Sequence, residues 1–295
     1  MNPEPFISVV IPTRNREARL RACLSSFEFQ EYPDGRWEII VVNDGGRSPW
    51  SALPPDLLTR LPLRTEDRKS GGPAAARNWG LSLARGAIVA FTDDDCRVFP
   101  DWLSQWTEAF NSGPWEAMGG RTLNAVPESL GARCHQYLVD FMYDYLRFEN
   151  GDAYLLVSNN AAFRRDALAR AGGFDEDFPR AAAEDRELSH RMAFAGHRLG
   201  YWPQARVWHD NPLSSLDYLR IQYRYGQGDA LLRGKLAERG IPLRIGQRRR
   251  PQFHLALAMK LWSDRAPLGM WLLLYNSQVM HHVGSLLARL SRRVG

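Results

Sequence analysis

Three short runs of apolar, largely β-branched residues constrain the fold of this chain more than any other feature. They are FISVVIPT (6–13), WEIIVVND (37–44) and AIVAFT (87–92), and a helical pattern separates each run from the next. Short apolar runs of this kind are typical of buried strands. Strands that alternate with helices predict an α/β domain with a parallel sheet.

Polar side chains stand where each run ends, namely Thr13, Asp44 and the Asp93–Asp95 triplet. Right-handed crossovers bring the carboxyl ends of parallel strands to one rim of the sheet. Ligands of open α/β sheets bind outside that rim. The order of elements therefore predicts a ligand site formed by these three strand ends.

The three consecutive aspartates raise a question of charge. Neighbouring carboxylates repel one another and resist losing water. A divalent cation, Mg²⁺ or Mn²⁺, would offset that repulsion, because hard cations prefer oxygen ligands. A solvated acidic loop is the alternative. The position at the strand ends favours a metal site.

The missing motifs narrow the ligand class. No G-x-G-x-x-G follows the first run and no G-x-x-x-x-G-K-[ST] occurs, which disfavours a dinucleotide dehydrogenase and a P-loop enzyme. The remaining candidate is a diphosphate bridged to carboxylates by a metal, which would neutralise a departing phosphate.

Two further stretches carry candidate chemistry. Glu184 and Asp185 fall in the first turn of a helix predicted near 184–195. They either stabilise that helix through its dipole or supply a general base. His209 ends a short predicted strand, ARVWHD, and is either structural or a metal ligand.

In this order the motifs resemble a family 2 glycosyltransferase with the GT-A fold. The matching stretches are VVIPTRN (9–15), IIVVNDGG (39–46), GGPAAARNWG (71–80), FTDDD (91–95), GGFDEDF (172–178), EDRELSHRM (184–192) and VWH (207–209). The resemblance implies a three-layer α/β/α sandwich with a mostly parallel central sheet. It also implies transfer of a sugar from a nucleotide-diphosphate donor, with inversion and a divalent metal.

The resemblance assigns the donor side of the site residue by residue. Pro12 and Thr13 would line the nucleotide pocket, and Asp44 would contact the base or ribose. Arg77 and Asn78 would lie near the donor.

The resemblance also assigns the metal and the base. Asp93 and Asp95 would form the metal-binding D-x-D pair, with His209 near the metal or the diphosphate. Asp94 would help to hold the donor sugar or the shape of the site. Asp185 would deprotonate the acceptor hydroxyl, with Glu184 as the alternative base.

Departures from the family pattern concern the nucleotide and the mode of addition. Arg14 stands where many members have an aromatic residue, and Asn43 where a second Asp is common. A Q-x-x-R-W motif of processive synthases is not formed, because Pro251 follows Gln247–Arg250. We therefore expect single addition, in the synthesis of a cell-surface polysaccharide or glycolipid.

The chain is predicted to divide into a catalytic domain, 1–210, and a basic, mainly helical extension, 211–295. Residues 205–295 hold 15 Lys and Arg against 5 Asp and Glu, a net of +10. A helix is expected within 212–236 and a basic linker at 244–252. The last predicted helix, within 269–293, carries an apolar stripe on one side, made of Leu272, Tyr275, Val279, Val283, Leu286 and Leu290.

Polar residues interrupt this last helix, so it is a poor membrane span. Its stripe either packs on the body of the protein or lies on an anionic inner membrane surface. The acceptor is expected to be a saccharide or a lipid-linked sugar, and no nucleic-acid partner is expected.

Three widely spaced cysteines and a start without a signal-peptide pattern favour a cytoplasmic location, with peripheral membrane contact as an addition. Two other functions stay open from the residues alone. One is a sugar-nucleotide nucleotidyltransferase, against which the lack of a glycine-rich loop counts. The other is a non-enzymatic basic binding module, which does not explain the ordered carboxylates.

Overall fold

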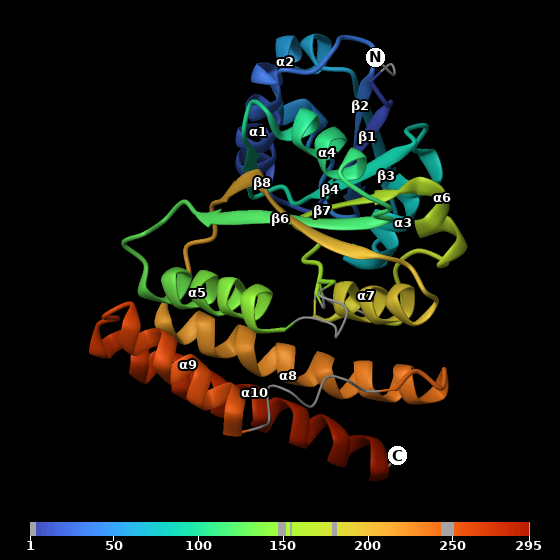
Figure 1. The fold of residues 1–295 in the computed structure, drawn as a ribbon. Coiled ribbons are helices and arrows are strands. Elements are labelled where there is room, and N and C mark those ends of the chain that lie inside the picture. Colours follow the sequence, from blue (N-terminus) through green and yellow to red (C-terminus); the bar gives the residue numbers. More distant parts are fainter. Residues whose placement is uncertain (1–3, 147–151, 154, 179–181, 243–250, 295) are drawn as a thin grey trace. The chain divides into compact units, whose positions relative to one another are not determined.

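The computed structural model describes residues 4–146, 152–153, 155–178, 182–242 and 251–294, with residues 292–294 described by their backbone alone (Figure 1). Contacts divide the chain into two units. Unit 1 comprises Met1–Leu123 and Leu156–Asp210, and unit 2 comprises Asn124–Leu155 and Asn211–Gly295. The segment Asn124–Leu155 thus belongs to the same unit as the C-terminal residues. The simpler division of the chain at residue 210 stays a prediction.

Unit 1 is built on a mostly parallel sheet, whose strand order is β3-β2-β1-β4-β7-β6-β8-β5. The strands are β1 (Ile7–Thr13), β2 (Trp37–Asp44), β3 (Leu63–Arg68), β4 (Ile88–Thr92), β5 (Cys96–Val98), β6 (Ala117–Asn124), β7 (Asn160–Arg164) and β8 (Leu199–His209). β3, β2, β1 and β4 run parallel, whereas β7 is antiparallel to β4 and β6, and β5 is antiparallel to β8. The predicted α/β class is confirmed.

Helices cover both faces of this sheet. Those of unit 1 are α1 (Glu17–Ser26), α2 (Pro55–Arg60), α3 (Pro73–Leu83), α4 (Trp102–Asn111), α6 (Arg165–Arg170) and α7 (Glu184–Phe194), with short 3₁₀ turns at Phe27–Phe29 and Trp50–Ala52. Along β1, Val9 and Ile11 join the core formed with α1, α2 and α4. Val10 points the other way, to α3, where a Cβ atom added at Gly80 would lie 2.3 Å from it. The alternation of side chains along a strand therefore produces the three layers.

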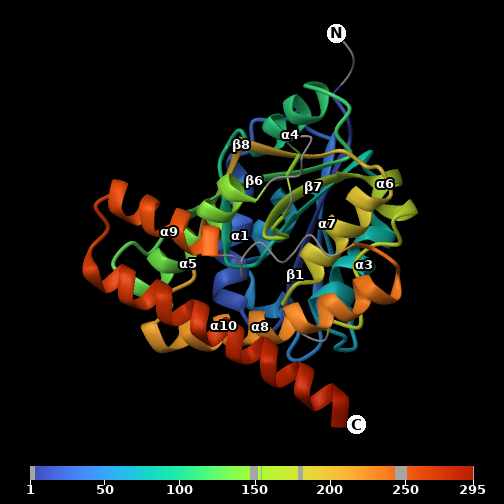
Figure 2. The same ribbon diagram turned by 60° about the horizontal axis from the view of Figure 1, so that its bottom comes forward.

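Unit 2 is helical in the part described. Its helices are α5 (Leu130–Tyr145), α8 (Ser215–Glu238), α9 (Pro251–Ser263) and α10 (Leu268–Val294). Figures 1 and 2 both show α10 running beside α8. The two helices cross closely, because a Cβ atom added at Gly226 of α8 would lie 2.0 Å from the carbonyl oxygen of His281.

The C-terminal predictions meet the structure in three ways. The helix predicted within 212–236 forms as α8, and α10 carries the predicted stripe. Most of the predicted basic linker, 244–250, lies outside the described residues, and α9 begins at Pro251. Within the part of the chain that the structure describes, no helix combines the length and the apolarity needed to cross a bilayer.

Candidate active site

The aspartate run after β4 is held by groups from β1 and α1. The Thr13 hydroxyl donates a hydrogen bond to Asp94 over 2.7 Å, from the end of the neighbouring strand. Arg16, at the start of α1, lies 3.0 Å from Asp94 and 3.2 Å from Asp95. Arg19, one turn later, lies 3.1 Å from Asp95. The two predicted strand ends therefore meet, and two arginines neutralise the carboxylates between them.

The two buried aspartates respond to this environment in opposite ways. Burial raises the pKa of Asp94 to about 6, with a further rise from Asp95 and an opposing effect of Arg16. Burial also acts to raise the pKa of Asp95, but interactions with His209, Arg16 and Arg19 outweigh it and the pKa lies below its usual value. Asp95 is thus the carboxylate that stays ionised most readily.

One buried arginine links this run to α7. Arg77 of α3 donates to Asp93 over 2.8 Å and to Glu184 over 3.0 Å. Its side chain is only 2% exposed, and its guanidinium lies 5.6 Å from the ring centre of Phe174. A buried cation needs both carboxylates, so Arg77 fixes the aspartate run and the start of α7 relative to each other.

Glu184 and Asp185 differ in exposure and in their partners. Both oxygens of the buried Glu184 have donors, Arg77 and the backbone N–H of Ala182. Asp185 is half-buried and accepts from the backbone N–H groups of Ser158 and Arg186. Ala183, directly before the pair, has φ of 85°, a left-handed conformation that an alanine rarely adopts. The surrounding structure holds this turn, and it leaves Asp185 as the more accessible carboxylate.

The same pair has raised pKa values. Burial raises the pKa of Glu184 to about 7, and the charge of Asp185 adds to the rise while Arg77 opposes it. Burial also raises the pKa of Asp185, against the opposing charges of Arg186 and Arg77. A carboxylate whose pKa moves toward neutrality is better suited to accept a proton.

A divalent cation fits one corner of the site. Donor atoms of Asp95, Cys96 and His209 lie within 4.8 Å of one another. The buried Asp95 Oδ1 has no hydrogen bond of normal geometry within the described ranges, and it lies 3.4 Å from His209 Nε2. Burial keeps the pKa of the Cys96 thiol well above its usual value, so this sulfur is a poor ligand for a hard cation. The carboxylate oxygen of Asp95 suits Mn²⁺ or Mg²⁺.

The predicted metal pair is only partly assembled. Asp93 turns to Arg77 and is not in the Asp95–His209 cluster, so its role as a metal ligand stays a prediction. Sequence reasoning did not place Arg16, Arg19 or Cys96 in the site. The three-residue spacing of the two arginines, directly after the first strand, was the available signal, because it puts both on one side of α1 near the strand ends.

The predicted donor-side residues lie at the same rim but are already engaged. Asp44, at the end of β2, accepts from Arg68 and from the backbone N–H groups of Gly71 and Gly72, over 2.8–3.0 Å. Asn78 of α3 binds the backbone of Phe174 through both its amide atoms. Pro12 lies beside Thr13 on β1 and is half-buried. These contacts shape the loops around the rim, and roles in donor binding stay predictions.

Comparison with known proteins assigns the family. Residues 8–172 match the profile of glycosyl transferase family 2, which is more than half of the chain. This chain belongs to glycosyl transferase family 2. The transferase is 26% identical to glycosyltransferase AglE of Haloferax volcanii over 76% of this chain and 73% of the relative. It is 29% identical to the pre-mycofactocin glycosyltransferase of Mycobacterium tuberculosis over 81% of this chain, but spans only half of that relative's length.

Solved structures support the fold of this transferase. The mannosyltransferase PcManGT of Pyrobaculum calidifontis, solved with GDP-Man and Mn²⁺, superposes with a TM-score of 0.64 at 19% identity, over 95% of this chain and 74% of that one. Residues 1–349 of S. aureus TarS, solved with UDP, give a TM-score of 0.57 at 18% identity, over 98% and 91%. The GT-A fold predicted from the motifs is confirmed.

Proposed function

We propose that this glycosyltransferase moves a sugar from a nucleotide-diphosphate donor to an acceptor hydroxyl, with inversion, by single addition and with a divalent metal. The observation that carries the proposal is the link through Arg77, which joins the Asp93 carboxylate to Glu184 over 2.8 and 3.0 Å. The aspartate run, the candidate diphosphate side, is thus joined to the start of α7, which carries the candidate base Asp185.

Asp185 acts as the general base. Its half-buried carboxylate takes the proton of the acceptor hydroxyl, and the acceptor oxygen then bonds to the anomeric carbon. The bond from that carbon to the diphosphate oxygen breaks, and its electron pair leaves with the nucleotide diphosphate. Attack from the face opposite the leaving group inverts the anomeric carbon. Glu184, which is buried and accepts a hydrogen bond from Arg77, holds that guanidinium in place.

The leaving diphosphate meets cationic groups. Asp95 and His209 would hold Mn²⁺ or Mg²⁺, which supplies Lewis-acid stabilisation of the departing phosphate. Arg16 and Arg19 have partly exposed side chains beside the same carboxylates, so they bind diphosphate oxygens when the donor is present. Asp94 helps to hold the donor sugar or the shape of the site. Pro12 and Thr13 line the nucleotide pocket, Asp44 contacts the base or ribose, and Asn78 lies near the donor.

The donor proposal draws on relatives with stated ligands. PcManGT was solved with GDP-Man and Mn²⁺, and TarS 1–349 with UDP-GlcNAc. We place the present enzyme in the cytoplasm, at the membrane surface through unit 2. Its acceptor would be a lipid-linked sugar or a saccharide on the way to a cell-surface polysaccharide or glycolipid.

Thermal unfolding with a panel of UDP, GDP, dTDP and CDP sugars tests the donor and the metal. A donor at about 100 times its Kd adds about 2.7 kcal/mol to the free energy of unfolding, so one nucleotide class should raise the Tm in the presence of Mn²⁺. Asp95→Asn should abolish the metal-dependent rise, whereas Asp166→Asn, an exposed acid on α6, should keep it. A panel without any stabilising donor would contradict the proposal, and a full shift without metal would remove the metal from it.

A further inference from the structure

One face of α10 is apolar and exposed along most of its length. This face carries the predicted stripe, and Leu268 extends the stripe by one turn. Tyr275 is half-buried, and the other members are exposed: Leu268, Leu272, Val279, Val283, Leu286 and Leu290. Spacings of three and four residues keep them on one side of the helix. With a rise of about 1.5 Å per residue, the stripe is roughly 33 Å long. An exposed apolar surface of this extent marks a contact with a partner or a membrane.

The opposite face of α10 already provides the contacts that unit 2 needs. Leu273 and Leu274 join the core with α5, α8 and α9, and Ser277 accepts a hydrogen bond from Tyr218 of α8. His281, on the same side, lies 3.0 Å from Asp229. The exposed stripe is therefore not the face on which the helix packs, and its continuous apolar character needs another explanation.

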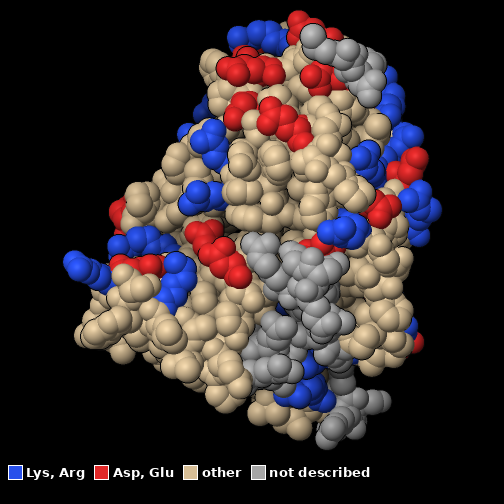
Figure 3. Space-filling model, in the orientation of Figure 1, with Lys and Arg blue, Asp and Glu red and all other residues tan. Residues whose placement is uncertain are grey.

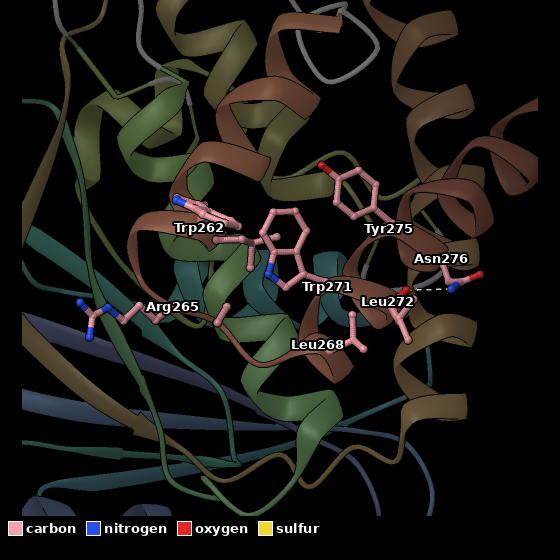
Figure 4. Close-up of a pocket in the computed structure, with 9 residues that line it drawn as sticks. Trp262, Arg265, Leu268, Trp271, Leu272, Tyr275 and Asn276 are labelled. Atoms are coloured by element: carbon pink, nitrogen blue, oxygen red, sulfur yellow. Dashed lines mark hydrogen bonds between the residues drawn. The ribbon is translucent and has the colours of Figure 1, made fainter.

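A pocket of about 810 Å³ lies between α9 and α10 and opens onto this stripe (Figure 4). Its walls include the rings of Trp262, Trp271 and Tyr275, with Leu268 and Leu272 beside them. Trp262 is 80% exposed, although tryptophan is normally among the better buried residues. The lining can therefore receive a hydrocarbon chain from outside the unit.

Basic side chains border the pocket and the stripe. Arg265 lines the pocket edge, and Figure 4 shows its guanidinium directed away from the aromatic rings. It is exposed and forms no ion pair with any residue whose position is described. Asp264, the one acidic residue from 251 to 295, is bound by Lys260 and by Tyr137, each over 2.9 Å. Arg289 adds a further cation along α10.

The charge distribution of Figure 3 agrees with this description. Charged side chains of both signs are spread over much of the visible face, whereas the region of α9 and α10 at the lower left is mostly uncharged below a small charged group. Five Lys and Arg face one Asp in the sequence from 251 to 295. An apolar surface with a basic border complements a bilayer of anionic lipids.

We propose that the exposed face of α9 and α10 rests on an anionic lipid bilayer, with the pocket between these helices receiving a lipid acyl chain and Arg265 binding a headgroup phosphate. The proposal rests on the membrane-surface location proposed above and assigns it a site. Trp262 enters the interface, where an indole ring combines an apolar body with a hydrogen-bond donor. A second copy of this chain would bring a like-charged border against Arg265 and Arg289, which disfavours it as the occupant.

Vesicle sedimentation without donor or metal tests the proposal. We expect the protein to bind vesicles of phosphatidylglycerol and phosphatidylcholine, to bind pure phosphatidylcholine more weakly, and to lose affinity as salt rises. Trp262→Glu and Leu272→Glu should each weaken binding by roughly tenfold or more, because they place a carboxylate on the lipid face. Arg265→Gln should weaken it by roughly fivefold, the effect of one cation near the surface. Phe29→Glu, at an exposed apolar residue of unit 1, should bind as the wild type does.

Three outcomes would overturn the proposal. They are no binding to the anionic vesicles, equal binding of the wild type and Trp262→Glu, and a wild-type dimer in sedimentation that Trp262→Glu dissociates. The last would assign the face to a second copy. Because the assay contains no sugar donor, its failure is distinct from failure of the transferase proposal, and Asp185→Asn should bind vesicles normally.

Discussion

The strand-end rim of unit 1 and the α9–α10 face of unit 2 depart from the usual distribution of side chains in opposite directions. The rim buries charges, including Arg77, Asp94 and Glu184, which ordinary folds keep at the surface. The α9–α10 face exposes large apolar side chains such as Trp262 and Leu286, which ordinary folds bury. Buried charges and exposed apolar side chains both raise the free energy unless another group covers or pairs them. The two regions meet this need in different ways.

The difference lies in what the chain itself supplies. At the rim every buried charge named above has an oppositely charged or hydrogen-bonding neighbour within about 3 Å, so the network is stable before any ligand arrives. The α9–α10 face has no such internal complement among the described residues, so it needs an external surface. Substitutions at the rim should therefore affect both stability and turnover, whereas substitutions on the face should affect association alone.

The largest effect is expected on turnover at Asp185. Asp185→Asn retains the size of the side chain and removes the proton acceptor, so the rate of sugar transfer should fall by about 10²–10⁴-fold. Transfer is measured with the donor identified by thermal unfolding, and circular dichroism checks the fold. Asp166→Asn, at an exposed acid in the same unit, should transfer at the wild-type rate. Equal rates for Asp185→Asn and the wild type would assign the base elsewhere.

The next effect tests the internal neutralisation of the rim. Arg77→Met leaves Glu184 and Asp93 without their shared cation, and breaking a buried pair in this way costs about 3–5 kcal/mol. Denaturant unfolding at pH 8 measures the loss. The double variant Arg77→Met, Glu184→Gln should recover part of it, because one of the uncompensated charges is gone.

An exposed ion pair outside the site provides the control for Arg77. Arg220 and Asp217 of α8 lie 3.0 Å apart, and at least half of each side chain is exposed to water. Arg220→Met should change the free energy of unfolding by no more than about 1 kcal/mol. If Arg77→Met were equally mild, the rim would not be a buried network in solution.

The buried charge of Glu184 at the rim should also make the stability of the protein depend on pH. Burial, together with the charge of Asp185, raises the pKa of Glu184 from 4.5 to about 7. The folded state therefore binds this proton more tightly than the unfolded chain does. The stabilisation is complete below about pH 4.5 and is lost as the pH rises through about 7. Glu184→Gln should flatten this decline, which unfolding curves at several pH values would show. Parallel profiles for the two proteins would contradict the raised pKa.

Local sequence signals predicted the parts of the rim that lie on regular elements. The β-branched runs identified β1, β2 and β4, and the helix predicted near 184–195 forms as α7. In contrast, β3 has the sequence LRTEDR, with half its residues exposed and only one apolar residue. Its sequence therefore lacks the pattern from which a buried strand is predicted. β5 is only three residues long and exists through its pairing with β8.

The charge pairing of the site was beyond sequence reasoning for a physical reason. Arg16 is 78 residues from Asp94 and Arg77 is 107 from Glu184, and nothing local states which carboxylate a given arginine will meet. The stripe of α10 was visible as a helical period, but the period does not say which face the core takes. The face that packs is the one that meets α8 at Gly226 and places Leu273 and Leu274 in the core of unit 2. This packing leaves the stripe on the opposite, exposed face.

The smallest effect on the free energy of unfolding is expected for a substitution on the exposed stripe of α10. Leu286 is half exposed, so Leu286→Gln should change the free energy of unfolding by no more than about 0.5 kcal/mol. Leu274, on the opposite side of the same helix, is fully buried, and Leu274→Ala should cost about 2–5 kcal/mol. Denaturant unfolding compares the two directly. A large loss for Leu286→Gln would mean that the stripe is covered by the chain itself, and the lipid surface would then have no open face to meet.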